Sequence, residues 1–391
     1  MKMRNSVRKY AVHHKNKIEK IYCTINRVRY YIEKPFCHRT VKITREHAQA
    51  LLQKFYPDPA RKLAKAESSY MARENNRTEY DLQIIVPAYN VEQYLEACME
   101  SILSQETSYA FQVILVEDGA TDCTREIAKR YTMNEHVRVV FQENQGVAAA
   151  RNRGLALLTA PYVMFVDSDD MLAPGAIEAC MQVAYKENAD IVEGTIQRKI
   201  DCSLSMYRRV DAYRMANAAE ELIGQPWGKV IRSSLFEEIR FPEGYWFEDT
   251  IGRFLVYELA KKTILIPEVV YVYRLELSSI SQSSKMSRKC IDTYWVTARL
   301  LRKRKEMGMA FDACFYQRVM EQILLNAKRV KDMPREVREA IFVLTGALVE
   351  TYFAPEIRME SSIWKLFESG DYGEYALYCK THSEGAVVQR K

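Results

Sequence analysis

The feature that most constrains this chain is a repeating alternation of short apolar runs and helical stretches that begins at Leu82. Each apolar run has the length of a strand, and each connection has room for a short helix. The expected strands are Ile84–Val86, Phe111–Val116, Val137–Phe141 and Tyr162–Val166, and the expected helices are Val91–Leu103, Thr121–Tyr131 and Gly146–Leu158. Such alternation is typical of a parallel α/β sheet. The core domain is therefore expected to begin near residue 81.

Polar residues follow each of these expected strands. In open parallel sheets, ligands collect outside the carboxyl ends of the strands, where loops converge and helix N-termini point their N–H groups inward. The residues after the four strands are Pro87, Ala88, Tyr89 and Asn90, then Glu117, Asp118 and Gly119, then Gln142 to Gln145, and finally Asp167, Ser168, Asp169 and Asp170. We expect one edge of one sheet to carry all of them.

The acidic cluster Asp167, Asp169 and Asp170 is the most informative of these groups. Clustered carboxylates repel one another and are costly to desolvate unless a positive charge lies among them. Oxygen ligands with open positions suit Mg²⁺ or Mn²⁺ held partly by substrate phosphates, rather than zinc. An EF-hand does not fit, because Leu172 stands where that loop needs glycine. The plainer interpretation is a solvated turn or a helix cap before Pro174.

Two common phosphate-binding loops are missing from the sequence. Gly224 and the Gly228-Lys229 pair enclose three residues where a P-loop needs four, and Val230 replaces the required Ser or Thr. No G-x-G-x-x-G pattern follows any expected strand. What remains is a nucleotide held by the first two strand ends and a diphosphate held by a metal. Tyr89 offers a ring face to a base, and Asp118 a carboxylate that could accept its N–H group.

Four segments stand in order at these strand ends, and two more follow in the second half. They are Pro87-Ala88-Tyr89-Asn90, Val116 to Asp122, Gly146 to Gly154, Val166 to Asp170, Trp227-Gly228-Lys229 and Glu248-Asp249. Together they resemble the family 2 glycosyltransferases, and the resemblance covers roughly Leu82 to Ser283. It implies the GT-A fold, a Rossmann-like mixed α/β sheet flanked by helices. Outside that region, helical periodicity predicts helical N-terminal and C-terminal extensions.

The resemblance implies a UDP-sugar donor bound at the strand ends. Tyr89 and Asp118 would contact the uracil-type base, while Asp167 would lie near the ribose and, with Asp169, ligate Mn²⁺ or Mg²⁺. The expected donor-binding residues are Pro87, Tyr89, Asn90, Glu117, Asp118, Arg151, Asp167, Ser168 and Arg274. Glu117 stands where the family usually has a shorter acidic residue, so its carboxylate reaches further from the backbone. Arg274 would face the diphosphate after loop closure.

The reaction that the family implies is a direct displacement with inversion at the sugar. An acceptor hydroxyl attacks the anomeric carbon, so the site needs a stabiliser of the leaving charge and a base for the proton. Asp249 is the expected base, with Glu248 as its competitor, because the strand-end acids are committed to the ion. Trp227 and Trp246 would line an acceptor groove for a glycan or lipid-linked acceptor.

Several of these residues also have a purely structural interpretation. Both tryptophans could fill the core, and Arg151 lies in an expected helix where a plain salt bridge is common. The Glu248-Asp249 pair could be a solvated turn, and Asp122 an ordinary helix cap. Two rival functions stay open. One is a sugar nucleotidyltransferase, although no Gly- and Lys-rich loop follows the first strand; the other is a non-catalytic transferase-like module recruited to a membrane or polyanion.

Charge is unevenly distributed along the chain. Residues 1–80 hold 19 Lys and Arg against 7 Asp and Glu, a net charge of +12, whereas residues 81–391 hold 38 against 44, a net charge of −6. The acidic body argues against a nucleic-acid partner. The basic extension is either a solvated face or a contact with an anionic membrane, where each Lys or Arg gains about 1 kcal/mol.

Cysteine usage and the lack of a recognised targeting signal predict a cytoplasmic protein, and the membrane alternative for the basic extension would add peripheral contact at the inner face of the plasma membrane. Nine cysteines form no C-x-x-C pair and have no nearby histidine spacing of the zinc type, so neither a disulfide frame nor structural zinc is predicted. No cleaved leader or spanning run is recognised. We expect a basic accessory region over 1–80, a transferase domain over 81–284 divided near residue 175 into nucleotide-binding and acceptor halves, and a helical region over 285–391.

Overall fold

The computed structural model describes residues 24–62, 79–200, 203–275, 287–359 and 361–388. Two compact units are present in it. A sheet unit comprises residues 58–282 with 302–304, and a helical unit comprises residues 1–57, 283–301 and 305–391. The described N-terminal and C-terminal parts are helical, as the sequence periodicity predicted. Among the described helices, none is both long enough and apolar enough to cross a bilayer.

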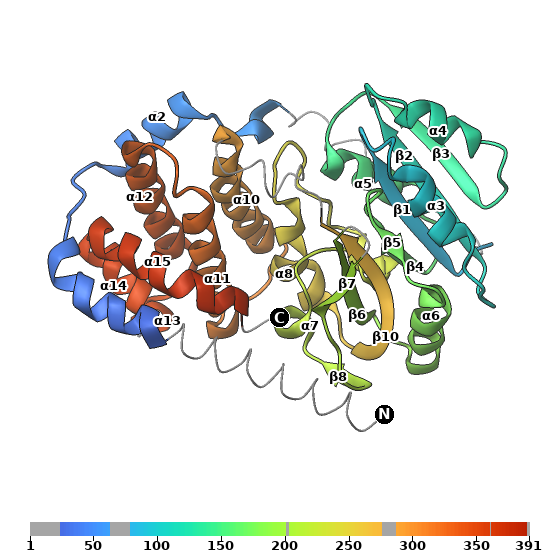
Figure 1. The fold of residues 1–391 in the computed structure, drawn as a ribbon. Helices are drawn as coiled ribbons and strands as arrows, with labels where there is room; N and C mark the ends of the chain where they lie inside the picture. The colour runs from blue at the N-terminus through green and yellow to red at the C-terminus, as the bar shows by residue number, and fades with distance from the viewer. Residues whose placement is uncertain (1–23, 63–78, 201–202, 276–286, 360, 389–391) are drawn as a thin grey trace. The chain divides into compact units, whose positions relative to one another are not determined.

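The sheet unit is built on one mixed sheet (Figure 1). Its strands are β1 (Leu82–Ala88), β2 (Phe111–Asp118), β3 (Val137–Gln142), β4 (Tyr162–Phe165), β5 (Met171–Leu172), β6 (Ile191–Ile200), β7 (Ser203–Arg208), β8 (Arg214–Ala216), β9 (Lys229–Arg232) and β10 (Thr263–Arg274). The main path runs β3-β2-β1-β4-β9-β6-β10-β5, with β7 on β6 and β8 on β10. The first four strands are parallel, as predicted, whereas β9 is antiparallel to both of its neighbours.

Three helices of the nucleotide-binding half and the first helix of the acceptor half pack on this sheet. They are α3 (Leu95–Leu103), α4 (Thr124–Arg130), α5 (Val147–Ala156) and α6 (Ala176–Glu187). The predicted helix over residues 91–103 begins four residues later; the amides of Val91 and Glu92 before it donate to the side chains of Thr124, the first residue of α4, and Asp122. Asp122 also accepts from the Thr124 amide at 2.9 Å, but Cys123 is the N-cap of α4, so Asp122 forms a turn directly before the cap and is not the predicted cap itself.

Close packing holds α5 against the middle of the sheet. All residues of β1 are buried. A Cβ atom added to Gly154 of α5 would lie 2.6 Å from Ile85, so only glycine allows this approach. Gly146, just before α5, has a φ of +90°, which suits glycine and lets the chain turn sharply from the β3 loop into the helix. The sequence of this segment therefore positions the N-terminus of α5 at the strand-end edge.

The acceptor half contains short helical segments between β8 and β10. These are α7 (Ala218–Glu221), η2 (Ser233–Phe236), η3 (Glu248–Thr250), α8 (Ile251–Phe254) and η4 (Val256–Leu259).

The helical unit contains α2 (Arg45–Phe55), α11 (Ala313–Arg329), α12 (Arg335–Tyr352), α13 (Pro355–Arg358), α14 (Ser362–Ser369) and α15 (Tyr372–Val388), with most of α10 (Asp292–Glu306) and the helical residues 24–37. α2 packs on α12, and α11 packs on α15 (Figure 1). Segments from opposite ends of the chain thus share one helical unit.

Candidate functional site

The ends of β2, β1 and β4 lie side by side at one edge of the sheet. Ala88 is opposite Glu117, and Ile85 is opposite Phe165, so the residues that follow these strands are level to within a few positions. Two strand spacings of about 4.8 Å, with an offset of two residues along the strands, put Asp118 and Asp167 about 12 Å from each other. The predicted convergence of the strand-end residues is therefore confirmed.

Asp118 organises the loop after β3. Its carboxylate accepts hydrogen bonds from the Gln142 side chain at 2.7 Å and from the Gln145 and Gly146 amides at 2.9 and 2.8 Å. The residue is 2% exposed. Both carboxylate oxygens thus hold the 142–146 loop in this conformation. The contact of Asp118 with a nucleotide base stays a prediction.

Glu117 lies deeper and is bound to its own loop. One carboxylate oxygen accepts from the Ala120 amide at 2.5 Å, and the other from Arg125 Nε at 2.7 Å. Gly119, which follows, has a φ of +69°, and a Cβ there would lie 2.5 Å from the Asn144 backbone. These contacts fix the shape of the loop, so Glu117 has a structural role here beside its predicted donor role.

The first motif divides into buried and exposed parts. Pro87 is buried as part of β1, whereas the Tyr89 ring is exposed at the edge, where a ligand can reach it. Asn90 adopts a φ of +52°, and its side-chain oxygen accepts from the Thr121 amide at 2.8 Å. Asn90 therefore links the β1 end to the β2 loop, and Tyr89 is the accessible member of this motif.

Arg151 of α5 is the centre of a buried ion-pair network. One guanidinium nitrogen donates to Asp167 at 2.7 Å and another to Glu248 at 2.5 Å. The guanidinium also lies over the Phe241 ring, 5.3 Å from its centroid. Burial opposes the charged form, but the carboxylates of Asp167 and Glu248 outweigh it and raise the pKa of Arg151. Arg151 therefore stays charged and joins the strand-end acids to the acidic turn.

The acidic turn, Glu248-Asp249, begins with backbone strain. Phe247, directly before it, has a φ of +66°, which a bulky residue rarely adopts. Glu248 is buried, and burial raises its pKa; Arg151 opposes this shift, while the charge of Asp249 adds to it. Asp249 is more exposed. The turn thus directs one carboxylate to Arg151 and leaves the other accessible.

The acidic cluster after β4 also divides by burial. Asp170 is buried, and its two oxygens accept from the Tyr271 hydroxyl at 2.8 Å and from the Arg274 amide at 2.6 Å. Burial raises the pKa of Asp170 well above its ordinary value, and the charges of Asp169 and Asp167 add to this. Asp167 and Asp169, both partly exposed, are the hard-oxygen pair that fits a divalent cation.

Arg274 and Ser168 flank this cluster. The Arg274 guanidinium lies over the ring of Tyr94 at 4.6 Å, and its Nε atom is buried without a hydrogen-bond partner. Ser168 is buried in the turn between the two exposed acids. The predicted contact of Arg274 with a diphosphate depends on loop closure. Residues 276–286, which follow closely in the chain, lie outside the described residues, so this contact stays a prediction.

Trp227 corrects one expectation about the acceptor groove. It is 4% exposed and stacks on Tyr271 and Tyr273, with ring centroids 4.7 and 5.5 Å away. As a core residue it presents no ring face to a ligand in this structure, so the packing interpretation holds for it. Trp246 is half-buried beside Phe247, and its acceptor role stays a prediction.

Two buried groups near the site were not assigned a role from the sequence. The Tyr271 hydroxyl accepts from the Asp167 amide at 3.1 Å while donating to Asp170, so it fixes the acidic cluster after β4. Lys229 is fully buried and pairs with Glu193 at 2.9 Å. Burial lowers the pKa of Lys229, against the attraction of Glu193. In the sequence, both residues appear only as a tyrosine and a lysine within apolar runs. That pattern does not identify the residue with which either side chain interacts.

Comparisons with known proteins agree on one family. A family model described as "Glycosyl transferase family 2" matches residues 83–243. The chain is 30% identical over 271 residues to "Glycosyltransferase GlyA" of Streptococcus pneumoniae serotype 4, covering 63% of this chain but 38% of that protein. It is 32% identical over 221 residues to "Glycosyltransferase GlyG" of the same strain, covering 52% of this chain and 73% of that protein.

Among solved structures, S. aureus TarS 1-349 in complex with UDP-GlcNAc is similar in fold. Its TM-score is 0.62 at 17% sequence identity, and the likeness covers 76% of this chain and 89% of that one. At this identity the likeness concerns the fold alone. The mixed sheet with flanking helices, described above, is thus shared with TarS.

Proposed function

The chain belongs to glycosyltransferase family 2 and has the GT-A fold, and from this premise we propose that it transfers a sugar from a UDP-sugar donor to a hydroxyl of a glycan or lipid-linked acceptor, with inversion at the anomeric carbon. One observation carries the proposal. Arg151 joins Asp167, at the end of β4, to the Glu248-Asp249 turn of the acceptor half. Donor-side and acceptor-side acids are thereby held in one network.

Donor binding is assigned to the strand-end edge. The exposed Tyr89 ring stacks on the base, and Asp118 and the loop it holds form the adjoining wall. A span of about 12 Å between Asp118 and Asp167 suits a ligand with a base at one end and a diphosphate at the other. TarS 1-349, which shares the fold, forms a complex with UDP-GlcNAc, and this supports a UDP-sugar as the donor class.

Asp167 and Asp169 are the residues that would hold a divalent cation, Mn²⁺ or Mg²⁺, which would supply charge neutralisation for the departing diphosphate. Arg151 occupies one oxygen of Asp167 and leaves the rest of that carboxylate for the ligand. Asp170 does not bind the ion, because Tyr271 and the Arg274 amide engage both of its oxygens. It positions the turn that carries its two neighbours.

Asp249 is proposed as the general base. Glu248, its competitor, is buried and paired with the guanidinium of Arg151, so it is poorly suited to receive a proton from an acceptor. Asp249 lies next to it and is more exposed. It accepts the proton of the acceptor hydroxyl as the oxygen attacks the sugar, a contribution of about 10²- to 10⁴-fold. Arg151 and Glu248 hold the turn in place.

Peripheral contact with an anionic membrane is the second part of the proposal. Helical residues 24–37 turn a polar face inward, where Asn26 is buried and Tyr30 bonds to Glu374. The opposite face is apolar and exposed, and consists of Ile25, Val28, Tyr31, Ile32 and Phe36. Residues 1–40 contain 11 Lys and Arg against 2 Glu. An exposed apolar face beside dense positive charge suits the interface of an anionic leaflet.

The enzymatic proposal is tested by UDP release from a panel of UDP-sugars, with and without Mn²⁺, using glycan and lipid-linked acceptors. We expect Mn²⁺-dependent release that Asp249→Asn abolishes while UDP affinity changes little. Glu248→Gln is the matched control, and it keeps measurable transfer. Full transfer by the Asp249→Asn variant would refute the assignment of the base. Pyrophosphate formed from a nucleoside triphosphate would instead support a nucleotidyltransferase.

A further inference from the structure

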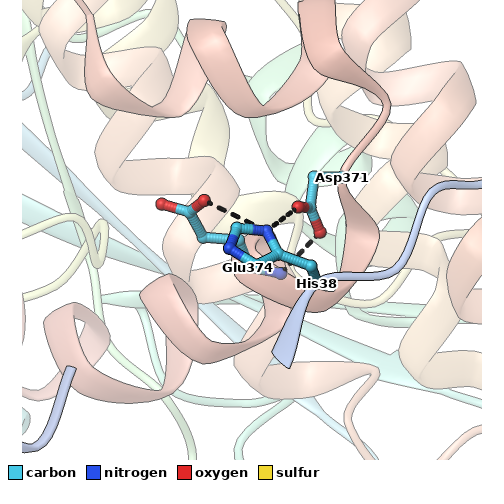
Figure 2. A group of neighbouring side chains, drawn as sticks. All are labelled: His38, Asp371 and Glu374. Carbon is cyan, nitrogen blue, oxygen red and sulfur yellow. Dashed lines mark hydrogen bonds and ion pairs between the residues drawn. The ribbon is translucent and has the colours of Figure 1, made fainter. Parts of the chain in front are cut away.

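Three side chains converge in the helical unit, and none of them has a role in the proposed sugar transfer. His38 follows the helical residues 24–37, while Asp371 and Glu374 stand at the start of α15. The His38 Nδ1 atom lies 2.5 Å from Asp371 Oδ2 and 3.9 Å from Glu374 Oε2. One ligand atom from each residue lies within 4.8 Å of the other two. Figure 2 shows both carboxylates directed at the imidazole ring.

Other contacts orient each carboxylate toward His38. Asp371 Oδ1 accepts the amides of Arg39 and Glu374 at 3.0 and 2.9 Å, so Oδ2 remains on the histidine side. Glu374 Oε1 accepts from the Tyr30 hydroxyl at 2.5 Å and pairs with Lys34 at 2.7 Å, so Oε2 remains on that side. Outer contacts of this kind orient ligands at metal centres. One oxygen of each acid is therefore presented to a shared point.

The backbone that carries these residues is tightly fitted. Thr40 forms a β-bridge with Asp371. A Cβ added to Gly373 would lie 1.7 Å from the carbonyl oxygen of Cys37, so this approach requires glycine. The segment before α2 is thus held against the start of α15 by backbone geometry, and the three side chains do not depend on a loose loop for their meeting.

We propose that His38, Asp371 and Glu374 bind a Zn²⁺ ion, with the fourth position open to water. One imidazole nitrogen and two carboxylate oxygens form a donor set that zinc accepts. Ligand atoms on a tetrahedral zinc ion are about 3.3 Å apart. The separations of 2.5 and 3.9 Å therefore need changes of less than about 1 Å. The ion replaces the hydrogen bond between His38 and Asp371.

Lys34 sets the expected strength of this site. Its ammonium group contacts the far oxygen of Glu374, and its charge opposes a nearby cation. With three protein ligands and this opposing charge, binding is weaker than at a closed four-ligand zinc site. The site is independent of the proposed sugar transfer, since its nitrogen ligand and its position in the helical unit differ from the oxygen-only pair after β4.

The test is calorimetric titration of the full chain, stripped of metal and free of nucleotide, with ZnCl₂. The wild type is expected to bind one equivalent that His38→Ala and Glu374→Gln each weaken by at least about tenfold. The matched control is His136→Ala, because His136 is also exposed but lies near a single carboxylate, Glu135, at 3.9 Å. Circular dichroism checks that each variant is folded.

Two results would overturn the proposal. The first is the absence of zinc binding by the wild type, or binding that His38→Ala and Glu374→Gln leave unchanged. The second is a zinc equivalent lost in Asp169→Ala but kept in both helical-unit variants, which would assign the ion to the acids after β4. The proposal is supported if His38→Ala and Glu374→Gln lose zinc binding while His136→Ala and Asp169→Ala retain it.

Discussion

Removing the guanidinium of Arg151 tests the buried network that joins the two halves of the site. The Arg151 and Glu248 side chains are 4% and 12% exposed, so their charges are almost fully desolvated, whereas Asp167 is 28% exposed and is partly screened by water. Arg151→Met leaves Glu248 as an unpaired buried charge. Breaking a buried pair in this way costs about 3 to 5 kcal/mol of unfolding free energy.

The partner variant should behave differently. In Glu248→Gln, the new amide oxygen can still accept from Arg151, and Asp167 still balances the guanidinium charge. The expected cost is about 1 kcal/mol. In the double variant no buried charge is left unpaired, so it should be more stable than Arg151→Met alone. The expected coupling energy is about 2 kcal/mol, within the range for residues in direct contact.

The assay is urea unfolding of the full chain, with hydrogen exchange in β4 and α5 used to identify the transition of the sheet unit. Arg232→Met is the control, because after that change Asp190 still accepts hydrogen bonds from the Lys261 and Lys262 amides, at 2.8 and 3.1 Å. Its expected cost is about 1 kcal/mol. Costs of Arg151→Met and Glu248→Gln that add within about 0.5 kcal/mol would refute the reasoning.

Three further variants test other parts of the structure. Lys229→Met should cost about 1 to 3 kcal/mol in urea unfolding, because the carbonyls of Ile223 and Gln225 lose a buried donor while Arg208 still pairs with Glu193. Lys262→Met, in a partly exposed pair, should cost at most about 1 kcal/mol; equal costs would contradict this. Burial lowers the pKa of His382, so the folded state favours the neutral imidazole. The contribution of His382 to stability is therefore complete above the ordinary histidine pKa of 6.5 and is lost as the pH falls. Between about pH 7 and 5, His382→Gln should lose less unfolding free energy than the wild type; parallel plots of stability against pH would speak against this. The double variant Ile32→Ser and Phe36→Ser should reduce sedimentation with anionic vesicles, and unchanged pelleting would end the membrane proposal.

The alternation of apolar runs was sufficient to predict the first half of the sheet. Each predicted strand there matches an observed one to within about two residues, because local periodicity and strand-end turns determine them. The antiparallel strand β9 was less visible. It is only four residues long and pairs with β4 and β6, so its position depends on contacts distant in sequence.

Site residues could be named from the sequence, but their partners could not. Arg151 and Glu248 are 97 residues apart, and His38 and Asp371 are 333 apart. No local spacing reveals such pairs, which is why the cysteine and histidine spacing predicted no zinc site. Trp227 shows the same limit. From the sequence, an aromatic residue beside a motif could either pack in the core or bind a ligand, and only its stacking on Tyr271 in the structure distinguishes these roles.

The most direct test of the account is hydrogen exchange of the full chain with and without UDP and Mn²⁺. Binding at the strand-end edge predicts slower exchange in residues 88–90, 117–120 and 167–170, and Asp169→Ala should remove the part of this protection that depends on Mn²⁺. Protection confined to other segments, or none at saturating UDP, would contradict it.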